Sequence, residues 1–260
     1  MQTVTSADGT ELAVDTAGSG PAVILLGGAF NDRSTVAGLA GVLAPSCTVH
    51  WYDRRGRGDS GDTPPYAVER EFEDLAAVIA YAGGHAHVFG HSSGAVLALE
   101  ATARGVAVDR LVAYEPPYVV SDREPSGVDL LDRMTALLAA GRRGDAVALF
   151  LTESAGVPAP VVESMQGSPD WGWMETFADS LPQDVALCGP GQALPAERLA
   201  RIGVPTLVLD GGESPEWMRA AARAVAAAVP GARSETVDGE DHGVLRNPEA
   251  LVPVLTGFLR

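Results

Sequence analysis

Short runs of β-branched and aliphatic residues recur along the chain, and each is followed by a turn and an amphipathic segment. Near-continuous apolar runs are typical of strands that are buried on both faces of a parallel sheet. The clearest predicted strands are Ala22 to Leu26, Thr48 to Tyr52, Ala86 to Phe89, Leu111 to Tyr114, Thr206 to Leu209 and Ser234 to Val237. Helices are predicted over Phe72 to Tyr81, Gly94 to Arg104, Pro215 to Val229 and Pro248 to Leu259. This order predicts an α/β fold, with helices on both faces of a mostly parallel sheet.

The opening stretch of the chain has a different pattern. The stretch from Gln2 to Ala17 alternates apolar and polar residues around the turn signature Ala7-Asp8-Gly9-Thr10, which predicts an antiparallel hairpin at the edge of the sheet. Counting that hairpin, the strand that ends at Tyr114 is the sixth.

A long segment without a strong strand separates Tyr114 from Thr206. It is about ninety residues long, which is too long for a simple loop. Asp129 to Ala140, Gly144 to Ser154 and Val161 to Ser180 have helical character, with glycines and prolines between them. We therefore expect a core made of residues 1–117 and 204–260, and a helical cap, residues 118–203, inserted after the sixth strand.

Composition and charge narrow the possible partners. The chain has 260 residues and a net charge of −16, a field that repels phosphate backbones and anionic lipid. No nucleic acid or membrane partner is expected, and a small neutral or apolar substrate is favoured. No stretch approaches the ~20 apolar residues of a membrane span, and the first residues lack a targeting pattern, so a cytoplasmic location is expected. The sequence carries no information on oligomeric state.

The cysteine count argues against two kinds of site. Cys47 and Cys188 are far apart in the sequence, and a zinc site or a disulfide framework would need more thiols or a closer spacing. No metal or cofactor is implied.

The strongest chemical signal is the pentapeptide Gly90-His91-Ser92-Ser93-Gly94, which follows one predicted strand and precedes a helix. This context is typical of a nucleophile elbow, in which glycines on both sides relieve the crowding around a strained serine. Ser92 is the candidate nucleophile. The amide of Ser93, at the start of the helix, is a candidate donor to a developing oxyanion.

A candidate base lies near the end of the chain, in Asp241-His242-Gly243, after the last predicted strand. A serine hydroxyl is a weak nucleophile at neutral pH until a positioned imidazole removes its proton. We therefore expect His242 to be the general base.

In these features the chain resembles the α/β-hydrolase family over nearly its whole length apart from the cap. Two further segments are similar to family motifs: Leu25 to Phe30, which looks like the oxyanion loop, and Tyr52 to Ser60, which looks like the Asp-x-x-Gly-x-Gly-x-Ser turn. Gly27-Gly28 replaces the His-Gly that is frequent in this loop. The resemblance implies that Ala29 or Gly28 supplies the second oxyanion donor.

The acid that would orient His242 departs from the commonest family pattern, because Ser214 occupies the usual position. A serine cannot balance an imidazolium charge. Glu115, Asp210 and Glu213 are the alternatives. The zearalenone-type lactonases of the family carry a glutamate after the earlier strand and Ser-Ser-Gly at the elbow, and this chain is similar in both respects. That resemblance favours Glu115.

Aromatic and sulfur-containing residues cluster in the predicted cap, although aromatic residues make up only 6% of the chain. Apolar side chains of this kind line most small-molecule pockets. The predicted substrate-binding residues are Phe30, Met165, Trp171, Trp173, Met174 and Phe177.

Together these features predict a serine hydrolase that cleaves a carboxylic ester or a lactone with an apolar acyl or ring portion. Two alternatives stay open. One is a thioesterase, perhydrolase or C–C hydrolase that uses the same site, and the other is a receptor-like ligand-binding protein with little turnover.

Overall fold

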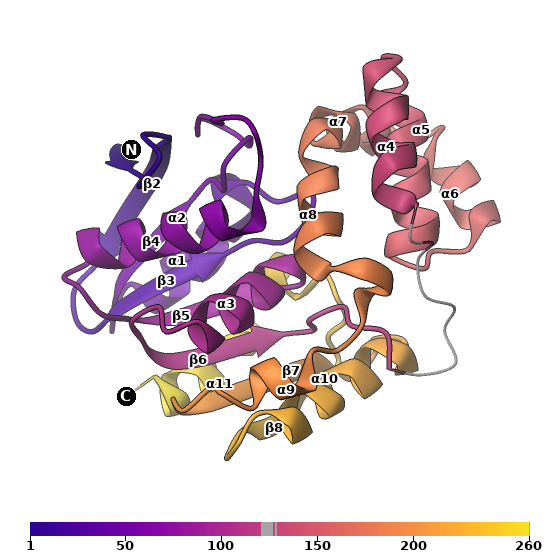
Figure 1. Ribbon diagram of the computed structural model, residues 1–260. Coiled ribbons are helices and arrows are strands. Elements are labelled where there is room, and N and C mark those ends of the chain that lie inside the picture. Colours follow the sequence, from indigo (N-terminus) through magenta and orange to yellow (C-terminus); the bar gives the residue numbers. More distant parts are fainter. Residues whose placement is uncertain (121–126, 128, 260) are drawn as a thin grey trace.

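One sheet runs through the molecule (Figure 1), and the computed structural model describes residues 1–120, 127 and 129–259. Within these residues the sheet has eight strands in the order β1-β2-β4-β3-β5-β6-β7-β8. The strands are β1 Gln2–Thr5, β2 Glu11–Gly18, β3 Ala22–Leu26, β4 Thr48–Tyr52, β5 Ala86–His91, β6 Val108–Tyr114, β7 Thr206–Gly211 and β8 Arg233–Val237.

The strand pairing confirms the predicted topology. β1 and β2 form the antiparallel hairpin, β2 also pairs antiparallel with β4, and the remaining neighbours are parallel. In the register of the central strands, Tyr114 of β6 lies opposite both His91 of β5 and Leu209 of β7. The residues that follow these three strands therefore emerge side by side at the carboxyl edge of the sheet, where ligand sites of such sheets form.

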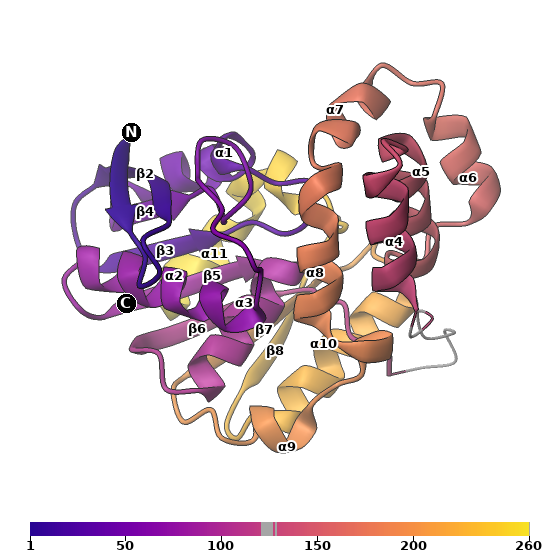
Figure 2. The same cartoon turned by 45° about the horizontal axis from the view of Figure 1, so that its top comes forward.

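Helices cover both faces of the sheet, as Figures 1 and 2 show from two directions. Helices α2 Val68–Tyr81, α3 Ser93–Ala103 and α10 Glu216–Ala228 pack on one face, and α1 Arg33–Leu43 and α11 Val252–Phe258 pack on the other. Alternate residues of β3 enter the two cores: Ile24 joins the first and Leu25 the second. Both are fully buried, in keeping with a strand that is covered on both sides.

Two helical segments of the core differ from the sequence prediction. α1 was not predicted, although Asp32 caps it by accepting a hydrogen bond from the backbone N–H of Thr35 in a capping box. The glycines Gly38 and Gly41 lower its helix propensity. The predicted helix from Pro248 to Leu259 is instead a 3₁₀ turn, Pro248–Leu251, followed by α11.

Most of the segment between β6 and β7 is helical and lies beyond the carboxyl edge of the sheet (Figures 1 and 2). Residues 121–126 and 128 of the predicted cap lie outside the described residues. The helices here are α4 Leu130–Ala139, α5 Arg143–Leu149, α6 Ala159–Met165, α7 Asp170–Thr176, α8 Leu181–Cys188 and α9 Ala196–Leu199, with a π-helix at Phe150–Ser154 and 3₁₀ turns at Ala178–Ser180 and Pro190–Gln192. The predicted single stretch from Val161 to Ser180 is thus broken into α6, α7 and a 3₁₀ turn. Short 3₁₀ turns at Val244–Arg246 and Pro248–Leu251 follow β8.

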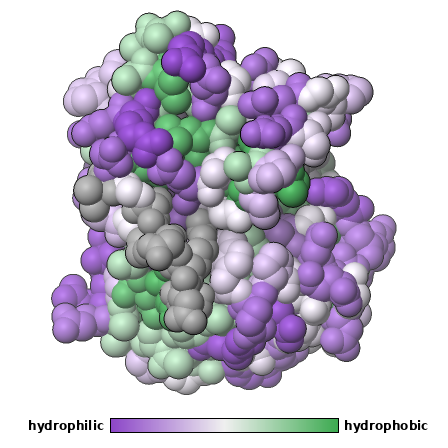
Figure 3. Space-filling view, turned by 90° about the vertical axis from the view of Figure 1, so that its right-hand side faces the viewer, coloured by the Kyte–Doolittle hydropathy of each residue, from purple (hydrophilic) through white to green (hydrophobic). Residues whose placement is uncertain are grey.

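These inserted helices have their own apolar cluster, which includes Leu130, Met134, Phe150, Trp171 and Met174. α8 contacts both α4 of the insert and α3 beneath the elbow, so it joins the two parts. Seen from the side of the insert, the surface is mostly hydrophilic, with hydrophobic residues showing in patches between the hydrophilic ones (Figure 3). None of the helices in the described part of the chain has the length and apolarity needed to cross a membrane.

Candidate active site

Ser92 stands at the sharp turn between β5 and α3, with a backbone φ of 56° and ψ of −124°. Few residues other than glycine adopt a positive φ, so the surrounding packing must impose this conformation. The flanking glycines make it possible. A Cβ on Gly90 would lie 2.4 Å from the carbonyl oxygen of Gly94, and a Cβ on Gly94 would lie 2.6 Å from that of Gly27. The turn therefore holds the Ser92 hydroxyl at the carboxyl edge of the sheet.

His242 and Glu115 meet beside this turn. The imidazole Nδ1 of His242 lies 2.7 Å from Oε2 of Glu115, and the backbone N–H of Gly211 donates to Oε1 at 2.8 Å. Burial of Glu115 opposes its ionisation, but the hydrogen bonds and the charge of His242 outweigh burial and lower the pKa of the carboxyl. Glu115 is therefore a buried carboxylate, and it fixes the Nδ1–H tautomer of His242.

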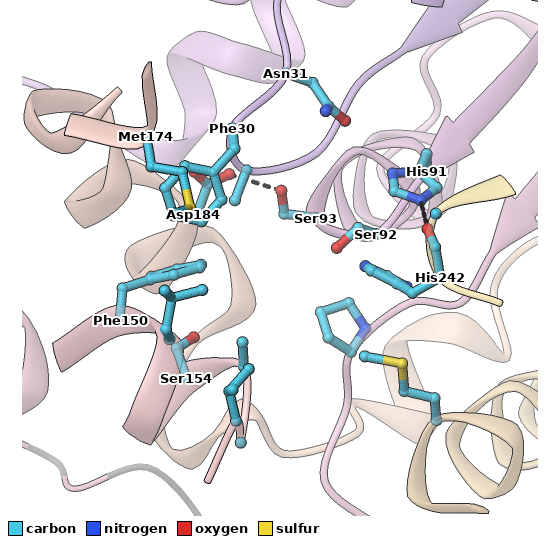
Figure 4. Close-up of a pocket in the computed structure, with 18 of the residues that line it drawn as sticks. Phe30, Asn31, His91, Ser92, Ser93, Phe150, Ser154, Met174, Asp184 and His242 are labelled. Carbon is cyan, nitrogen blue, oxygen red and sulfur yellow. Dashed lines mark hydrogen bonds between the residues drawn. The ribbon is translucent and has the colours of Figure 1, made fainter. Parts of the chain in front are cut away.

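The free side of the imidazole faces the serine. In Figure 4 the hydroxyl of Ser92 and the ring of His242 point toward one another across the floor of the pocket. With Nδ1 engaged by Glu115, Nε2 is the nitrogen left to accept a proton.

The other two candidate acids are placed differently. Asp210 is buried, and its carboxylate lies 3.6 Å from Arg219 of α10 rather than against the imidazole. Glu213 lines the pocket. Among the described residues, Glu115 is the carboxylate that forms a hydrogen bond with His242.

The loop after β3 passes close to the serine. A Cβ on Gly28 would lie 2.7 Å from Cβ of Ser92, so only glycine allows this approach. The Gly28 N–H already donates to Oδ1 of Asn31 at 2.9 Å and is not free for a ligand. The N–H groups of Ala29 and Ser93 have no acceptor in the described parts of the chain. Of the three oxyanion donors predicted from the sequence, these two remain available.

A cluster of buried charges lies next to the same turn. Asp184 of α8 accepts hydrogen bonds from the hydroxyl of Ser93 at 2.6 Å, from Arg54 at 2.9 Å and from Arg57 at 2.7 Å. Arg54 also pairs with Glu71 of α2. Burial opposes the charge of Asp184, but the two guanidinium groups outweigh burial and lower its pKa. The positive charges of the two arginines balance the negative charges of Asp184 and Glu71, so the buried cluster carries no uncompensated charge.

The pocket above Ser92 has a volume of about 1050 Å³. Four of the six residues predicted to bind substrate line it: Phe30, Met165, Trp173 and Met174. Trp171 instead lines a separate shallow hollow beside Gly141 and Glu175. Phe177 does not reach the pocket either, because it packs behind Phe30, with ring centroids 6.4 Å apart.

Sequence reasoning missed several apolar residues that line this pocket, which are Phe150, Leu151, Val157, Trp217 and Met218. Phe150 packs edge-on against Phe30 at 5.5 Å (Figure 4). Phe150 lies in a segment that was predicted to be helical, but the pattern did not indicate which of its faces meets the core. The structure has no group of three or more His, Cys, Asp or Glu side chains placed to hold a metal among the residues that it describes.

His91 packs against His242 on the buried side. Its Nε2–H donates to the backbone carbonyl of His242 at 2.8 Å, and its ring packs between Tyr114 and His242. Burial, and then the charge of His242, lower the pKa of His91 to about 3. His91 is therefore a neutral residue that positions the loop of His242.

Comparisons with known proteins agree with this fold. Residues 23–254 match the model of a family described as the alpha/beta hydrolase family. A crystal structure of an alpha/beta hydrolase from Sphaerobacter thermophilus DSM 20745 is 53% identical, with a TM-score of 0.93 over 100% of both chains. An enol-lactonase from Burkholderia xenovorans LB400 is 20% identical, with a TM-score of 0.74 over 99% of each chain, a likeness of fold alone.

A curated relative, an uncharacterized hydrolase named YraK from Bacillus subtilis (strain 168), is 34% identical over 113 residues. The match spans 42% of this chain and 42% of the relative.

The buried neutral His91 predicts a pH dependence of stability. Its folded pKa of about 3 lies below the unfolded value of about 6.5, so the unfolded chain binds the extra proton between these values. Stability therefore falls as the pH drops below about 6.5, by up to about 1.4 kcal/mol per pH unit for this residue. His91→Gln, whose amide can still donate to the carbonyl of His242, should show a shallower acid dependence.

The measurement is the free energy of unfolding in urea at pH 7, 6, 5 and 4.5 for both proteins. Because Glu115 is present in both, its own acid titration cancels in the difference. Parallel curves for the two proteins would show that His91 is not held neutral.

Proposed function

Since the chain belongs to the alpha/beta hydrolase family, we propose that it hydrolyses a carboxylic ester or a lactone through an acyl-enzyme on Ser92. The observation that carries the proposal is the 2.7 Å hydrogen bond that the imidazole of His242, which faces Ser92, donates to Glu115. It supports a triad of Ser92, His242 and Glu115, in which Glu115 serves as the acid although the usual acid position holds a serine.

The proposed reaction has two halves. His242 Nε2 takes the proton of Ser92 as Oγ attacks the carbonyl carbon, and the N–H groups of Ala29 and Ser93 receive the oxyanion. The imidazolium, stabilised by Glu115, then protonates the departing alcohol oxygen. A water molecule attacks the acyl-enzyme with the same assistance, and the carboxylic acid leaves. In a lactone the alcohol and the acid remain parts of one product.

The walls of the pocket support an apolar acyl or ring portion. Phe30, Phe150 and Met174 stand together on the side opposite His242 (Figure 4). Apart from Asp184, whose charge Arg54 and Arg57 balance, the charged residues of the lining are mainly acidic, with Asp170, Glu213 and Asp241 against Arg246. A carboxylate-bearing substrate would be repelled here, which favours a neutral small molecule.

The triad is tested by turnover of nitrophenyl esters and of a panel of neutral lactones. Ser92→Ala should abolish turnover, and Glu115→Gln should lower kcat by about 10³- to 10⁴-fold, because the imidazolium loses its counter-charge and its tautomer control. Asp210→Asn serves as the matched control and should change kcat by less than about tenfold.

A fluorophosphonate probe followed by peptide mass spectrometry locates the nucleophile independently of the substrate. It should label Ser92 in the wild type. A large loss in Asp210→Asn with little loss in Glu115→Gln would contradict the assignment of the acid. A labelled Ser92 without turnover on any ester or lactone would instead favour another chemistry at this site or a ligand-binding role.

The size of the pocket predicts how kcat/KM depends on the length of the acyl chain. Met174→Trp places a larger side chain in the cavity, so esters with long acyl chains should lose kcat/KM relative to acetate. Each methylene kept out of the pocket costs about 0.8 kcal/mol, or about fourfold. Trp171→Phe is the control, because Trp171 lines the separate hollow and not this pocket, and it should leave the chain-length profile unchanged. Equal shifts in both variants would show that the profile is not set by this cavity.

A further inference from the structure

The peptide unit between Gly28 and Ala29 is held by a charged side chain. Arg57 donates from Nη1 to the carbonyl oxygen of Gly28 at 2.6 Å, and Arg57 is 3% exposed. A trans peptide directs its C=O and its N–H in opposite directions. Anchoring the Gly28 carbonyl to Arg57 therefore fixes the direction of the Ala29 N–H.

This peptide unit turns about ψ of Gly28, and a glycine tolerates a wide range of backbone conformations because it has no Cβ, so without the anchor the unit would be easier to reorient. The neighbouring residue, Phe30, has a φ of 57° and is itself in an unfavourable conformation. Asn31 contributes a weaker backbone hydrogen bond to the same carbonyl at 3.3 Å. The short charged hydrogen bond from Arg57 is the stronger of the two.

Arg57 is in turn positioned by the insert. One oxygen of Asp184, Oδ2, accepts from Arg57, and the other, Oδ1, accepts from the hydroxyl of Ser93. The bond between Asp184 and Ser93 is visible in Figure 4. A single buried carboxylate on α8 thus contacts Ser93 directly and reaches the Ala29 peptide through Arg57.

We propose that Arg57 and Asp184 are positioning residues for the oxyanion site, and that they make the geometry of both backbone donors depend on the seating of α8. The proposal rests on the proposed function. Neither side chain touches the reacting atoms. Both act through the direction of the Ala29 and Ser93 N–H groups, which matters only when the carbonyl oxygen becomes negatively charged.

The test compares Arg57→Met, Arg57→Lys and Asp184→Asn on a nitrophenyl ester, with kcat expressed per Ser92 titrated by a fluorophosphonate. Arg57→Met should lower kcat by about 100-fold, the loss typical of one oxyanion donor, with KM within about threefold of wild type. Arg57→Lys should recover part of the loss, since an ammonium can still donate to the Gly28 carbonyl. Asp184→Asn, which keeps the shape but not the charge, should show a smaller loss of kcat.

A second measurement separates positioning from a merely structural effect. A trifluoromethyl ketone that adds to Ser92 carries an oxyanion, and the matched methyl ketone carries none. Arg57→Met should weaken the binding of the trifluoromethyl ketone by the same factor as it lowers kcat, and it should leave the affinity for the methyl ketone unchanged.

Arg55→Lys is the matched control, because Arg55 is also a buried arginine of this turn but pairs with Asp74 and Asp8, away from the oxyanion loop. It should lower stability and leave kcat per titrated Ser92 unchanged.

Two results would overturn the inference. One is a wild-type kcat per titrated site in Arg57→Met, and the other is a loss confined to KM or matched by Arg55→Lys. A wild-type protein that turns over no ester or lactone is a separate outcome, which overturns the proposed function and this inference with it. Circular dichroism and urea unfolding identify any variant that does not fold, and Asp184→Asn then carries the same comparison.

Discussion

The rest of the site depends on one constraint, which is the close packing of the loop after β3 against Ser92 and the start of α3. The chain after β3 and the chain after β5 approach so closely that Gly28 and Gly94 have no room for a Cβ, and Gly90 has none because the start of α3 packs against it. This approach is possible because β3 and β5 are parallel neighbours in the sheet, so both loops leave from the same edge. The strain at Ser92 is held by two strands and a buried helix, and not by the turn alone.

The same sheet geometry accounts for the position of the acid. β5, β6 and β7 are neighbours, and the residues after each of them reach the same edge. Side chains alternate along β7, and Asp210 shares a face with Val208, toward α10, where Arg219 lies 3.6 Å away. Glu115 instead leaves the end of β6 with a φ of 46° and occupies the space beside β7, where the N–H of Gly211 binds it. The longer side chain of Glu115, at the end of the neighbouring strand β6, thus reaches the imidazole of His242. Ser214 has no carboxylate with which to balance the charge of that imidazole.

Features that depend on local spacing could be predicted from the sequence. The parallel sheet and the candidates Ser92 and His242 each follow from local patterns of residues. Glu115 was one of three candidate acids, and the resemblance to the zearalenone-type lactonases, not its spacing, favoured it. The orientation of the inserted helices could not be predicted in the same way. They are short and broken, so helical periodicity does not fix which side faces the pocket, and Trp171 turns away where Phe150 turns in.

The link between Arg57 and Asp184 was beyond the sequence for a different reason, since the two residues are 127 positions apart. Its energetics also differ from those of the apolar core. Withdrawing charges from water costs several kcal/mol per ion, and well-packed apolar residues of similar size often stabilise a protein as much or more. Stability alone is therefore a poor account of four charges buried together beside Ser93. What such a cluster provides, and an apolar one cannot, is direction: each hydrogen bond fixes an angle as well as a contact. A site that must hold two backbone N–H groups at fixed angles toward one oxygen is where that property has most effect.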